Sequence, residues 1–292
     1  MRVRAVPKEK IRTIQKEDWI DRSRRPYAEG ETIWVPVKDD AAFDCVIPKR
    51  QDYKGRGFFM IGEIAVIHGT RPARSEVEEI VQFRHPQGVL WIELLNEMTR
   101  TPSTEILWGD VGEVRHHENG YSYFLDPQRV MFSQGNRVEK LRMATLVRDR
   151  NHNERVADMF AGIGYFTVPV AGSGGFVHAM EINPVAFEYL ERNVLVNGLS
   201  DHVTASLGDC RVLLSGIYDR IIMGHFDAIQ FLPAALEHAE AGSTIHVHSI
   251  GSVEDQIKEI CESAGFSSTI IVHKVKKYRP HAWHVVQDVT LA

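Results

Sequence analysis

The sequence has few cysteines and only one long apolar stretch, which is interrupted. Its 292 residues contain three cysteines, Cys45, Cys210 and Cys261, and no two of them form a CxxC pair. Neither a disulfide framework nor a zinc ribbon is indicated, and we expect a reducing, cytoplasmic environment. The apolar stretch VADMFAGIGYFTVPVAG is interrupted by Asp158 and by glycine and proline, and no apolar segment follows the basic N-terminal residues. We therefore expect neither a signal peptide nor a membrane span.

The sequence also lacks an excess of positive charge, since its formal net charge at pH 7 is −5. The net charge thus gives no sign of a nucleic-acid partner, but basic residues are locally enriched. Residues 1–25 hold nine basic side chains against four acidic ones. The segment HKVKKYRPHAWH combines basic and aromatic residues: Lys274, Lys276, Lys277, Arg279, Tyr278 and Trp283. Such a segment either contacts a phosphate backbone and stacks an unpaired base, or is a solvated surface.

The pattern of apolar segments changes near residue 150. Residues 1–150 combine strand-like segments with a helix expected over residues 73–83 and a turn at Glu118-Asn119-Gly120, which predicts a smaller mixed α/β domain. In residues 151–292, helix-competent segments follow each of the apolar segments RVADMF, GGFVHAM, HVTASL, DRIIMG and STIHVHSI. This alternation predicts a parallel sheet covered on both faces. The last segments, STIIVHKVKKY and WHVVQDVTL, predict an antiparallel hairpin at the sheet edge, joined through Arg279-Pro280-His281.

One helix can be predicted in detail, directly after the segment GGFVHAM. Asn183 suits the N-cap, Pro184 suits the first helical position, and Gly198 stands where a left-handed residue would end the helix. An apolar stripe follows at helical spacing: Phe187, Leu190, Val194 and Leu195.

The strongest chemical signal is the glycine-containing turn after the segment RVADMF. Ala161-Gly162-Ile163-Gly164 predicts a turn that allows close approach of the backbone to a ligand and leads into a helix N-terminus. Thr167 stands where a dinucleotide-binding fingerprint has its third glycine, so a tight pyrophosphate fit is not required. Phe160 beside the turn either stacks on a base or belongs to the core.

Two acidic residues end the next two predicted strands. Glu181 follows Asp158 by 23 residues, and an acid at this strand end can accept hydrogen bonds from both hydroxyls of a ribose. Asp209 ends the following strand, which places it near an adenine amino group. The alternative is that each acid only caps its own helix. Three consecutive strand ends would line one crevice.

These segments carry a resemblance to a known family. DMFAGIGYF, MEINPVAFEYLERNV and GDC resemble the S-adenosylmethionine-binding domain of class I methyltransferases. They are most similar to the archaeal and eukaryotic enzymes that modify the guanosine beside the anticodon, over roughly residues 55–290. The resemblance implies an α/β, Rossmann-like class I methyltransferase fold with a mostly parallel seven-stranded sheet over residues 151–292. Residues 1–150 would form a smaller domain that contacts tRNA and completes the cofactor pocket.

Two chemistries occur within that group of enzymes. The N1-guanine methyltransferases carry an arginine in a PR-L-S-T-E-R segment and an N-L-P segment after the fourth strand. This sequence has Ser133-Gln134-Gly135-Asn136 and Met223-Gly224-His225 instead. The pattern FS-x-GN-x-x-EK with M-G resembles the wybutosine-pathway tRNA aminocarboxypropyltransferases, which transfer the 3-amino-3-carboxypropyl group of S-adenosylmethionine to C7 of 4-demethylwyosine in phenylalanine tRNA. A tRNA guanine-N1 methyltransferase and an inactive RNA-binding relative are the alternatives.

The resemblance implies roles for individual residues. Ser133 and Lys140 would hold the methionine end of S-adenosylmethionine, with Lys140 as the cation for its carboxylate. Without the resemblance, the alternative interpretation of Lys140 is a surface lysine. Glu181 would bind the ribose. The expected cofactor-binding set is Ser133, Lys140, Asp158, Phe160, Gly162, Gly164, Glu181, Ile182, Asp209 and Cys210. Asp209 and Cys210 would contact the adenine, and Asp158 would organise the glycine turn or bind the amino group.

The acceptor side is expected to involve a second set of residues. Gly224 would leave room for the tricyclic base, and His225 either assists removal of the C7 proton or is part of the wall. Lys276, Lys277 and Arg279 would bind tRNA. We expect no metal, because the pairs His246/His248 and His116/His117 lack a third ligand at suitable spacing. We expect the protein to be a monomer.

Overall fold

The structure is a computed structural model that describes residues 1–292 except positions 12, 15, 30–31, 48–52, 96–99, 151–152 and 280. Arg12 of the N-terminal basic segment and Pro280 of the predicted hairpin connection lie outside the described residues. The described chain divides into two compact units, Met1–Lys54 and Gly55–Ala292. The boundary expected near residue 150 falls inside the second unit, and the tRNA-contacting role of residues 1–150 remains a prediction.

The first unit is a small antiparallel sheet. Its described strands are β1 (Arg2–Pro7), β2 (Tyr27–Glu29), β3 (Thr32–Pro36) and β4 (Cys45–Val46), in the order β2-β3-β1-β4. A short 3-10 helix, η1 (Lys8–Lys10), follows β1. Val3, Val6, Val35 and Val37 are buried and provide its small core.

The second unit begins with a four-stranded sheet, counted over its described residues, in the order β5-β6-β7-β8. Its elements are β5 (Phe59–Ile61), β6 (Ile64–His68), α1 (Arg74–Arg84), β7 (Gly88–Leu95) and β8 (Pro102–Gly109), so the helix expected over residues 73–83 is confirmed. The hairpin of β9 (Val114–Glu118) and β10 (Tyr121–Leu125) follows. Asn119 and Gly120 both have positive φ, 54° and 87°, as a two-residue hairpin turn requires.

A seven-stranded sheet, counted among the described residues, forms the rest of the unit in the order β13-β12-β11-β14-β15-β17-β16. Its strands are β11 (Arg155–Asp158), β12 (Phe176–Glu181), β13 (Val203–Leu207), β14 (Arg220–Met223), β15 (Thr244–Ile250), β16 (Ser268–Arg279) and β17 (Ala282–Leu291). The strands β11 to β15 pair in parallel, whereas β17 pairs antiparallel with both β15 and β16. The sheet is therefore mixed, and the expectation of a mostly parallel sheet describes β11 to β15 only.

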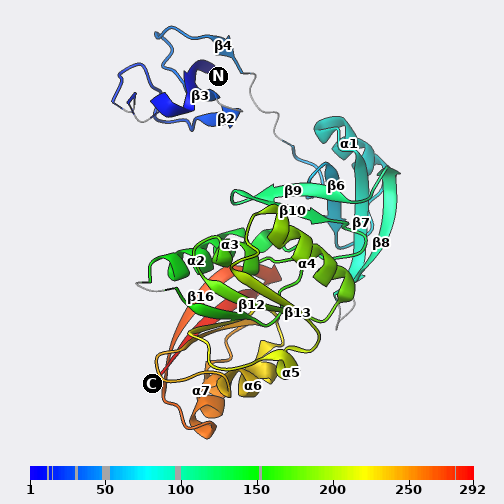
Figure 1. Cartoon of the computed structure of the whole chain (residues 1–292). Helices are drawn as coiled ribbons and strands as arrows, with labels where there is room; N and C mark the ends of the chain where they lie inside the picture. Colours follow the sequence, from blue (N-terminus) through cyan, green and yellow to red (C-terminus); the bar gives the residue numbers. More distant parts are fainter. Residues whose placement is uncertain are drawn as a thin grey trace. The chain divides into compact units, whose positions relative to one another are not determined.

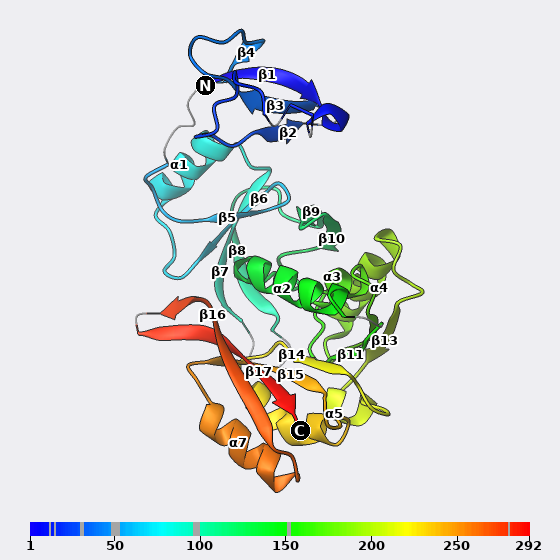
Figure 2. The same ribbon diagram turned by 90° about the vertical axis from the view of Figure 1, so that its left-hand side faces the viewer.

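Helices cover both faces of this sheet. Figure 1 shows α2 (Arg137–Arg148), α3 (Thr167–Ala171) and α4 (Pro184–Val196) on one face, and α5 (Cys210–Leu213), α6 (Leu232–Leu236) and α7 (Glu254–Ser263) on the other. Short 3-10 helices, η2 (Gln134–Asn136) and η3 (Ala228–Phe231), precede α2 and α6. Figure 2 shows β16 and β17 as a long hairpin, as predicted from the C-terminal segments. Among the described residues, no helix is both long enough and apolar enough to cross a membrane.

Helix α4 largely confirms the sequence prediction. The Asn183 side chain accepts hydrogen bonds from the backbone N–H groups of Val185 and Ala186, and Gly198 has a φ of 68°. Leu190 and Val194 are buried, but Leu195 is 69% exposed and does not belong to the stripe. One residue turns the helix by about 100°, so the Leu195 side chain points away from the buried face on which Val194 lies.

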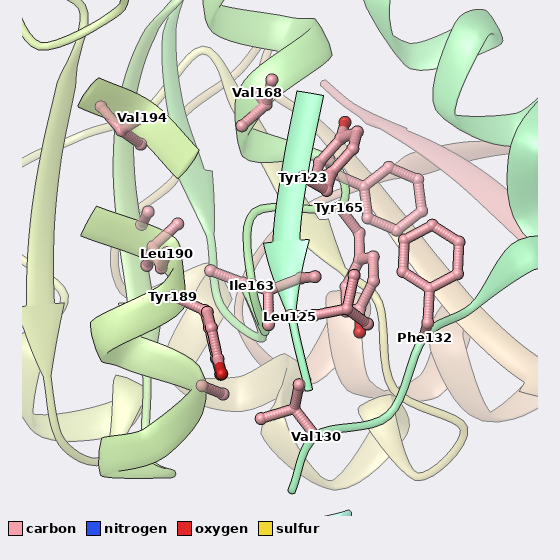
Figure 3. Packing of buried hydrophobic residues seen from close by; sticks show 14 of the residues in the cluster. Tyr123, Leu125, Val130, Phe132, Ile163, Tyr165, Val168, Tyr189, Leu190 and Val194 are labelled. Atoms are coloured by element: carbon pink, nitrogen blue, oxygen red, sulfur yellow. The ribbon is translucent and has the colours of Figure 1, made fainter. Parts of the chain in front are cut away.

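The two faces of the sheet have separate buried clusters. Figure 3 shows that the cluster under α4 combines residues from several segments: Tyr123, Leu125, Val130, Phe132, Ile163, Tyr165, Val168, Tyr189, Leu190 and Val194. The rings of Phe132 and Tyr165 meet edge to face, with centroids 5.7 Å apart. Residues before position 150 thus pack directly on the glycine turn that follows β11, which explains why the chain does not divide there.

Candidate active site

A cavity of about 920 Å³ lies at the carboxyl ends of β11, β12, β13 and β14. Its wall is formed by the strand ends, by the turn before α2 and by β16. The predicted site residues on this wall are Ser133, Phe160, Gly162, Glu181, Ile182, Asp209, Cys210, Gly224, His225, Lys276 and Lys277. Ligands bind at the carboxyl edge of open parallel sheets, so the location agrees with the predicted crevice.

Another cavity, of about 460 Å³, lies at the opposite edge of the sheet. Arg155, His178 and His202 are among its lining residues, near the starts of β11, β12 and β13. It contains none of the predicted site residues. The first cavity is therefore the candidate site.

The glycine turn has the backbone geometry that the sequence predicts. Gly162 and Gly164 have φ values of 58° and 99°. A Cβ atom on Gly162 would lie 2.4 Å from Cε2 of Tyr165, so a larger residue would displace that ring. Gly164 does not line the cavity; a Cβ there would lie 3.0 Å from Val168. Gly162 shapes the wall, and Gly164 permits the packing behind it.

Glu181 is held in place by the backbone. One carboxylate oxygen accepts the Gly162 N–H at 2.7 Å, and the other accepts the Asn183 N–H at 2.7 Å. Burial raises the pKa of Glu181, while these backbone hydrogen bonds oppose the rise. Each carboxylate oxygen has a further lone pair, so Glu181 can accept two hydroxyl groups from a ligand without moving.

Asp158 lies behind the cavity wall and is completely buried. Its Oδ2 accepts a hydrogen bond from the Thr167 hydroxyl at 2.7 Å, whereas its Oδ1 has no partner among the described residues. Burial raises the pKa of Asp158 to about 6. Asp158 therefore connects the end of β11 to α3 and is not itself a lining residue.

Asp209 lines the cavity and also caps a helix. Its Oδ1 accepts the backbone N–H of Arg211 at 2.9 Å and the Arg211 Nε–H at 3.0 Å. The hydrogen bond from the Arg211 side chain holds the pKa of Asp209 below its ordinary value. Asp209 therefore caps its own helix, as in the alternative interpretation, and also lies on the cavity wall, as predicted. Burial raises the pKa of the neighbouring Cys210 thiol to about 12, so this thiol stays protonated.

Lys140 lies elsewhere than predicted. It is fully buried and does not line the cavity. Its ammonium donates to Glu118 at 2.7 Å and lies 4.7 Å and 5.0 Å from the ring centroids of Phe132 and Tyr165. Burial lowers the pKa of Lys140, and Glu118 opposes this shift. The structure therefore differs from both expectations for Lys140, a ligand cation and a surface lysine, because Glu118 already neutralises its charge inside the core.

On the acceptor side, Gly224 and His225 follow β14. A Cβ on Gly224 would lie 3.1 Å from the Phe166 ring, so even alanine would be tight. The His225 ring packs on Phe160, with centroids 5.4 Å apart. Its Nδ1 accepts the backbone N–H of Asp227 at 3.2 Å. The neutral imidazole therefore carries its proton on Nε2 and is a donor there. Burial lowers the pKa of His225 and favours this neutral form.

Sequence reasoning missed several lining residues, of which Arg100 and Phe226 are chemically the most distinctive. The Arg100 guanidinium lies 5.8 Å from the centroid of the Phe226 ring. Arg100 precedes β8 and has a φ of 54°. No local sequence pattern predicts that Arg100 lies in the site, because Phe226, the residue it contacts there, is 126 positions later in the sequence. Arg279, in contrast, was predicted but does not line the cavity.

The histidines of the two pairs contact other groups of the protein. In the part of the chain that the structure describes, no group of three or more His, Cys, Asp or Glu residues could hold a metal ion. His246 contacts Asp288 and Arg220, and His248 contacts His284. His116 accepts the Gly62 N–H, and His117 lies 3.2 Å from the Ser122 hydroxyl.

The mixed sheet, the glycine turn and the acids at successive strand ends define the class: the chain has a class I S-adenosylmethionine-dependent methyltransferase-like fold. More specifically, residues 114–268, more than half of the chain, match the TRM5/TYW2 methyltransferase domain. The chain belongs to the TRM5/TYW2 family.

Similar proteins include both branches of that family. A Methanocaldococcus jannaschii tRNA(Phe) (4-demethylwyosine(37)-C(7)) aminocarboxypropyltransferase is 34% identical, and the match covers 78% of this chain and 95% of the relative. The solved structure of Pyrococcus horikoshii TYW2 in complex with MeSAdo is 30% identical with a TM-score of 0.69, and covers 81% of this chain and 91% of that one. Trm5b from Pyrococcus abyssi is 25% identical with a TM-score of 0.73, and covers 99% of both chains.

Proposed function

We propose that this chain transfers the 3-amino-3-carboxypropyl group of S-adenosylmethionine to C7 of 4-demethylwyosine, beside the anticodon of phenylalanine tRNA. The observation that carries the proposal is the 34% identity over 95% of the length of a relative named for this reaction. The cavity supports it, because Ser133-Gln134-Gly135-Asn136 and Gly224-His225 line the same cavity. These are the segments in which the sequence departs from the N1-guanine methyltransferase pattern.

The residues present fit S-adenosylmethionine. Gly162 allows its backbone to approach the ligand, Glu181 is oriented to accept the ribose hydroxyls, and Asp209 with Cys210 borders the place for the adenine. Asp158 would act from behind the wall, by holding α3 through the hydrogen bond from Thr167 and not by contact with the ligand. A cavity of about 920 Å³ is near the upper end of ordinary small-molecule sites, so it has room for more than the adenosine part alone.

When bound, S-adenosylmethionine supplies a sulfonium leaving group. The protein's main task is therefore to position the γ-carbon against C7 and to keep the methyl group away from the nucleobase. A bond forms between C7 and the γ-carbon, the bond from the γ-carbon to sulfur breaks with its electron pair going to sulfur, and C7 loses a proton. Methylthioadenosine is the by-product.

His225 has a more specific role in this proposal than the sequence alone indicates. The hydrogen bond from the Asp227 N–H to Nδ1 makes Nε2 a donor in the neutral ring. We assign His225 to hydrogen bonding with an acceptor atom on the base, which orients its C7 edge. The removal of the C7 proton is left to water in this proposal.

The tRNA would be bound by exposed basic and aromatic residues on the hairpin of β16 and β17. Lys277 and Arg279 are exposed, as are Tyr278 at 49% and Trp283 at 41%. The Lys274 ammonium lies 5.5 Å from the Trp283 ring centroid, so a cation and a stacking surface occur together. Residues 1–150 are proposed to add further tRNA contacts, and the protein is proposed to act as a monomer in the cytoplasm.

A tRNA guanine-N1 methyltransferase is the second candidate, because the matched family domain is described as a methyltransferase domain and is named for TRM5 as well as TYW2. The test uses S-adenosylmethionine labelled separately in its methyl and carboxypropyl parts. One reaction contains phenylalanine tRNA with 4-demethylwyosine, and a parallel reaction contains the same tRNA with an unmodified guanosine at that position. Carboxypropyl label on the tRNA together with methylthioadenosine supports the proposal. Methyl label on the tRNA together with S-adenosylhomocysteine supports the second candidate, and no transfer of either label contradicts both.

A further inference from the structure

Lys276 is a partly buried cation on the cavity wall, and it has no carboxylate partner among the residues that the structure describes. Burial lowers the pKa of Lys276. Its positive charge also contributes to the lowered pKa values of His68, Lys140 and His284. A desolvated ammonium without a counterion is stabilised by an anionic ligand.

The Lys276 side chain lies across the turn that precedes α2. A Cβ atom on Gly135 would be 2.4 Å from Lys276 Nζ and 2.8 Å from its Cδ. Residue 135 therefore has to be small for the ammonium to reach this place. The contact joins β16 to η2, whose sequence positions are about 140 residues apart.

Asn136 supplies a second polar group at the same turn. It lines the cavity, is 9% exposed, and its Oδ1 has no hydrogen-bond partner among the described residues. Asn136 is the N-cap residue of the 12-residue helix α2. The positive end of the helix dipole adds to the field of Lys276. A buried amide oxygen without a partner is costly, which indicates that a ligand donor completes it.

Lys140, the cation expected from the sequence, is not available for this purpose. Its ammonium is paired with Glu118 and has no exposed surface. Lys277, the next residue after Lys276, is exposed. Lys276 is thus the lysine that combines a place on the wall, partial burial and a side chain lying across the turn.

We propose that Lys276 and Asn136 form the subsite for the amino-acid end of the donor, in which the ammonium of Lys276 binds its carboxylate and Oδ1 of Asn136 accepts from its amino group. This inference rests on the proposed use of S-adenosylmethionine and replaces the tRNA-binding role expected for Lys276. Lys276 and Asn136 act as positioning residues, since holding this end would direct the γ-carbon toward the base.

The test compares two ligands by calorimetry in the absence of tRNA. Methylthioadenosine contains the adenosine part and the methyl group but lacks the aminocarboxypropyl group. Lys276→Met should lower the affinity for S-adenosylmethionine by about 10- to 100-fold, as expected for a lost charge-assisted contact, and should leave methylthioadenosine binding unchanged. Lys258→Met, at an exposed position on α7 that does not line the cavity, is the matched control and should change neither affinity.

Two further variants examine the same geometry. Gly135→Ala should lower the affinity for S-adenosylmethionine alone, because its Cβ would displace the Lys276 ammonium. Asn136→Leu should have the same selective effect, with circular dichroism confirming that the variant is folded. If Asn136→Leu does not fold, Asn136→Ser is used instead, because the smaller side chain leaves the turn less crowded.

The inference is overturned if Lys276→Met changes both affinities equally or neither of them. It is also overturned if Lys276→Met lowers the salt dependence of tRNA binding as much as Lys277→Met does, because Lys276 would then be a phosphate contact. A failure of the proposed function gives a different result. In that case the labelling experiment shows methyl transfer, while Lys276→Met still lowers the affinity for S-adenosylmethionine and not for methylthioadenosine.

Discussion

The adenosine side and the transfer side of the cavity are built differently. The adenosine side consists of consecutive strand ends of one sheet, and its Glu181 and Asp209 are already hydrogen bonded to nearby backbone N–H groups. The transfer side combines the turn before α2, the residues after β14, Arg100 and β16. It contains polar groups without protein partners, such as Lys276 and Asn136, within the described residues.

This difference indicates a division of tasks. On the adenosine side, the carboxylates that line the wall, Glu181 and Asp209, are already hydrogen bonded. This wall holds its shape without a ligand, so it can bind any molecule that carries the adenosine group. A side with unsatisfied groups gains most from the ligand that completes them. The adenosine side should therefore determine affinity in general, and the transfer side should determine which carbon of the donor faces the base.

The largest expected effect concerns the stability of the adenosine side. The pKa of Asp158 is raised from 3.8 to about 6, so its contribution to stability is complete below about pH 4 and is lost as the pH rises through about 6. Asp158→Asn cannot ionise. Its free energy of unfolding should exceed that of the wild type by on the order of 3 kcal/mol at pH 7, since one pKa unit corresponds to about 1.4 kcal/mol.

Urea unfolding at several pH values between 4 and 7.5 checks this prediction. The difference between Asp158→Asn and the wild type should be small near pH 4 and should grow toward pH 7. A constant difference over this range would show that the Asp158 carboxyl titrates normally. Asp201→Asn, at an exposed position, is the matched control variant.

The next effect concerns binding on the adenosine side. Glu181→Ala should weaken S-adenosylmethionine and methylthioadenosine equally, by on the order of 2 kcal/mol, because both ligands carry the ribose. Calorimetry with the two ligands measures this, and Glu188→Ala on the exposed face of α4 is the matched control. Unchanged affinity for both ligands would show that Glu181 does not bind the ribose. A loss of affinity for S-adenosylmethionine alone would contradict the proposed division between the adenosine side and the transfer side.

A smaller effect is expected at His225 on the transfer side. His225→Gln retains a side-chain N–H donor, so its rate of transfer should stay within a few fold of the wild type, whereas His225→Ala should lose about tenfold. The measurement is the single-turnover rate as a function of pH. A general base would behave differently: both variants would lose activity, and the wild-type rate would fall as the pH drops through the lowered pKa of His225.

The smallest effect concerns the exposed hairpin. Replacing both Lys277 and Arg279 by Gln should weaken tRNA binding modestly and reduce the slope of log affinity against log salt by about 1 to 2, because fewer counterions are released. Filter binding at several salt concentrations checks this. The affinity for S-adenosylmethionine should not change. A slope equal to that of the wild type would place the tRNA elsewhere.

Much of the adenosine side could be predicted from the sequence because its signals are local. The positive φ of Gly162, the N-cap of Asn183 and the acid at the end of β12 each follow from a few neighbouring residues. The errors have physical reasons as well. The boundary near residue 150 was expected from a change of pattern, but Phe132 packs on Tyr165 across it. Leu195 was assigned to a buried stripe that ends one residue earlier.

The sequence by itself determined the strand-and-helix order, the glycine turn and the strand-end acids, since these depend on backbone preferences over short distances. Only the tertiary structure decided which lysine faces the cavity. Lys140 pairs with Glu118 inside the core, and Lys276 lies against Gly135 on the cavity wall. Such contacts join segments that are up to about 140 residues apart, and their energies depend on burial and charge pairing that no local pattern contains.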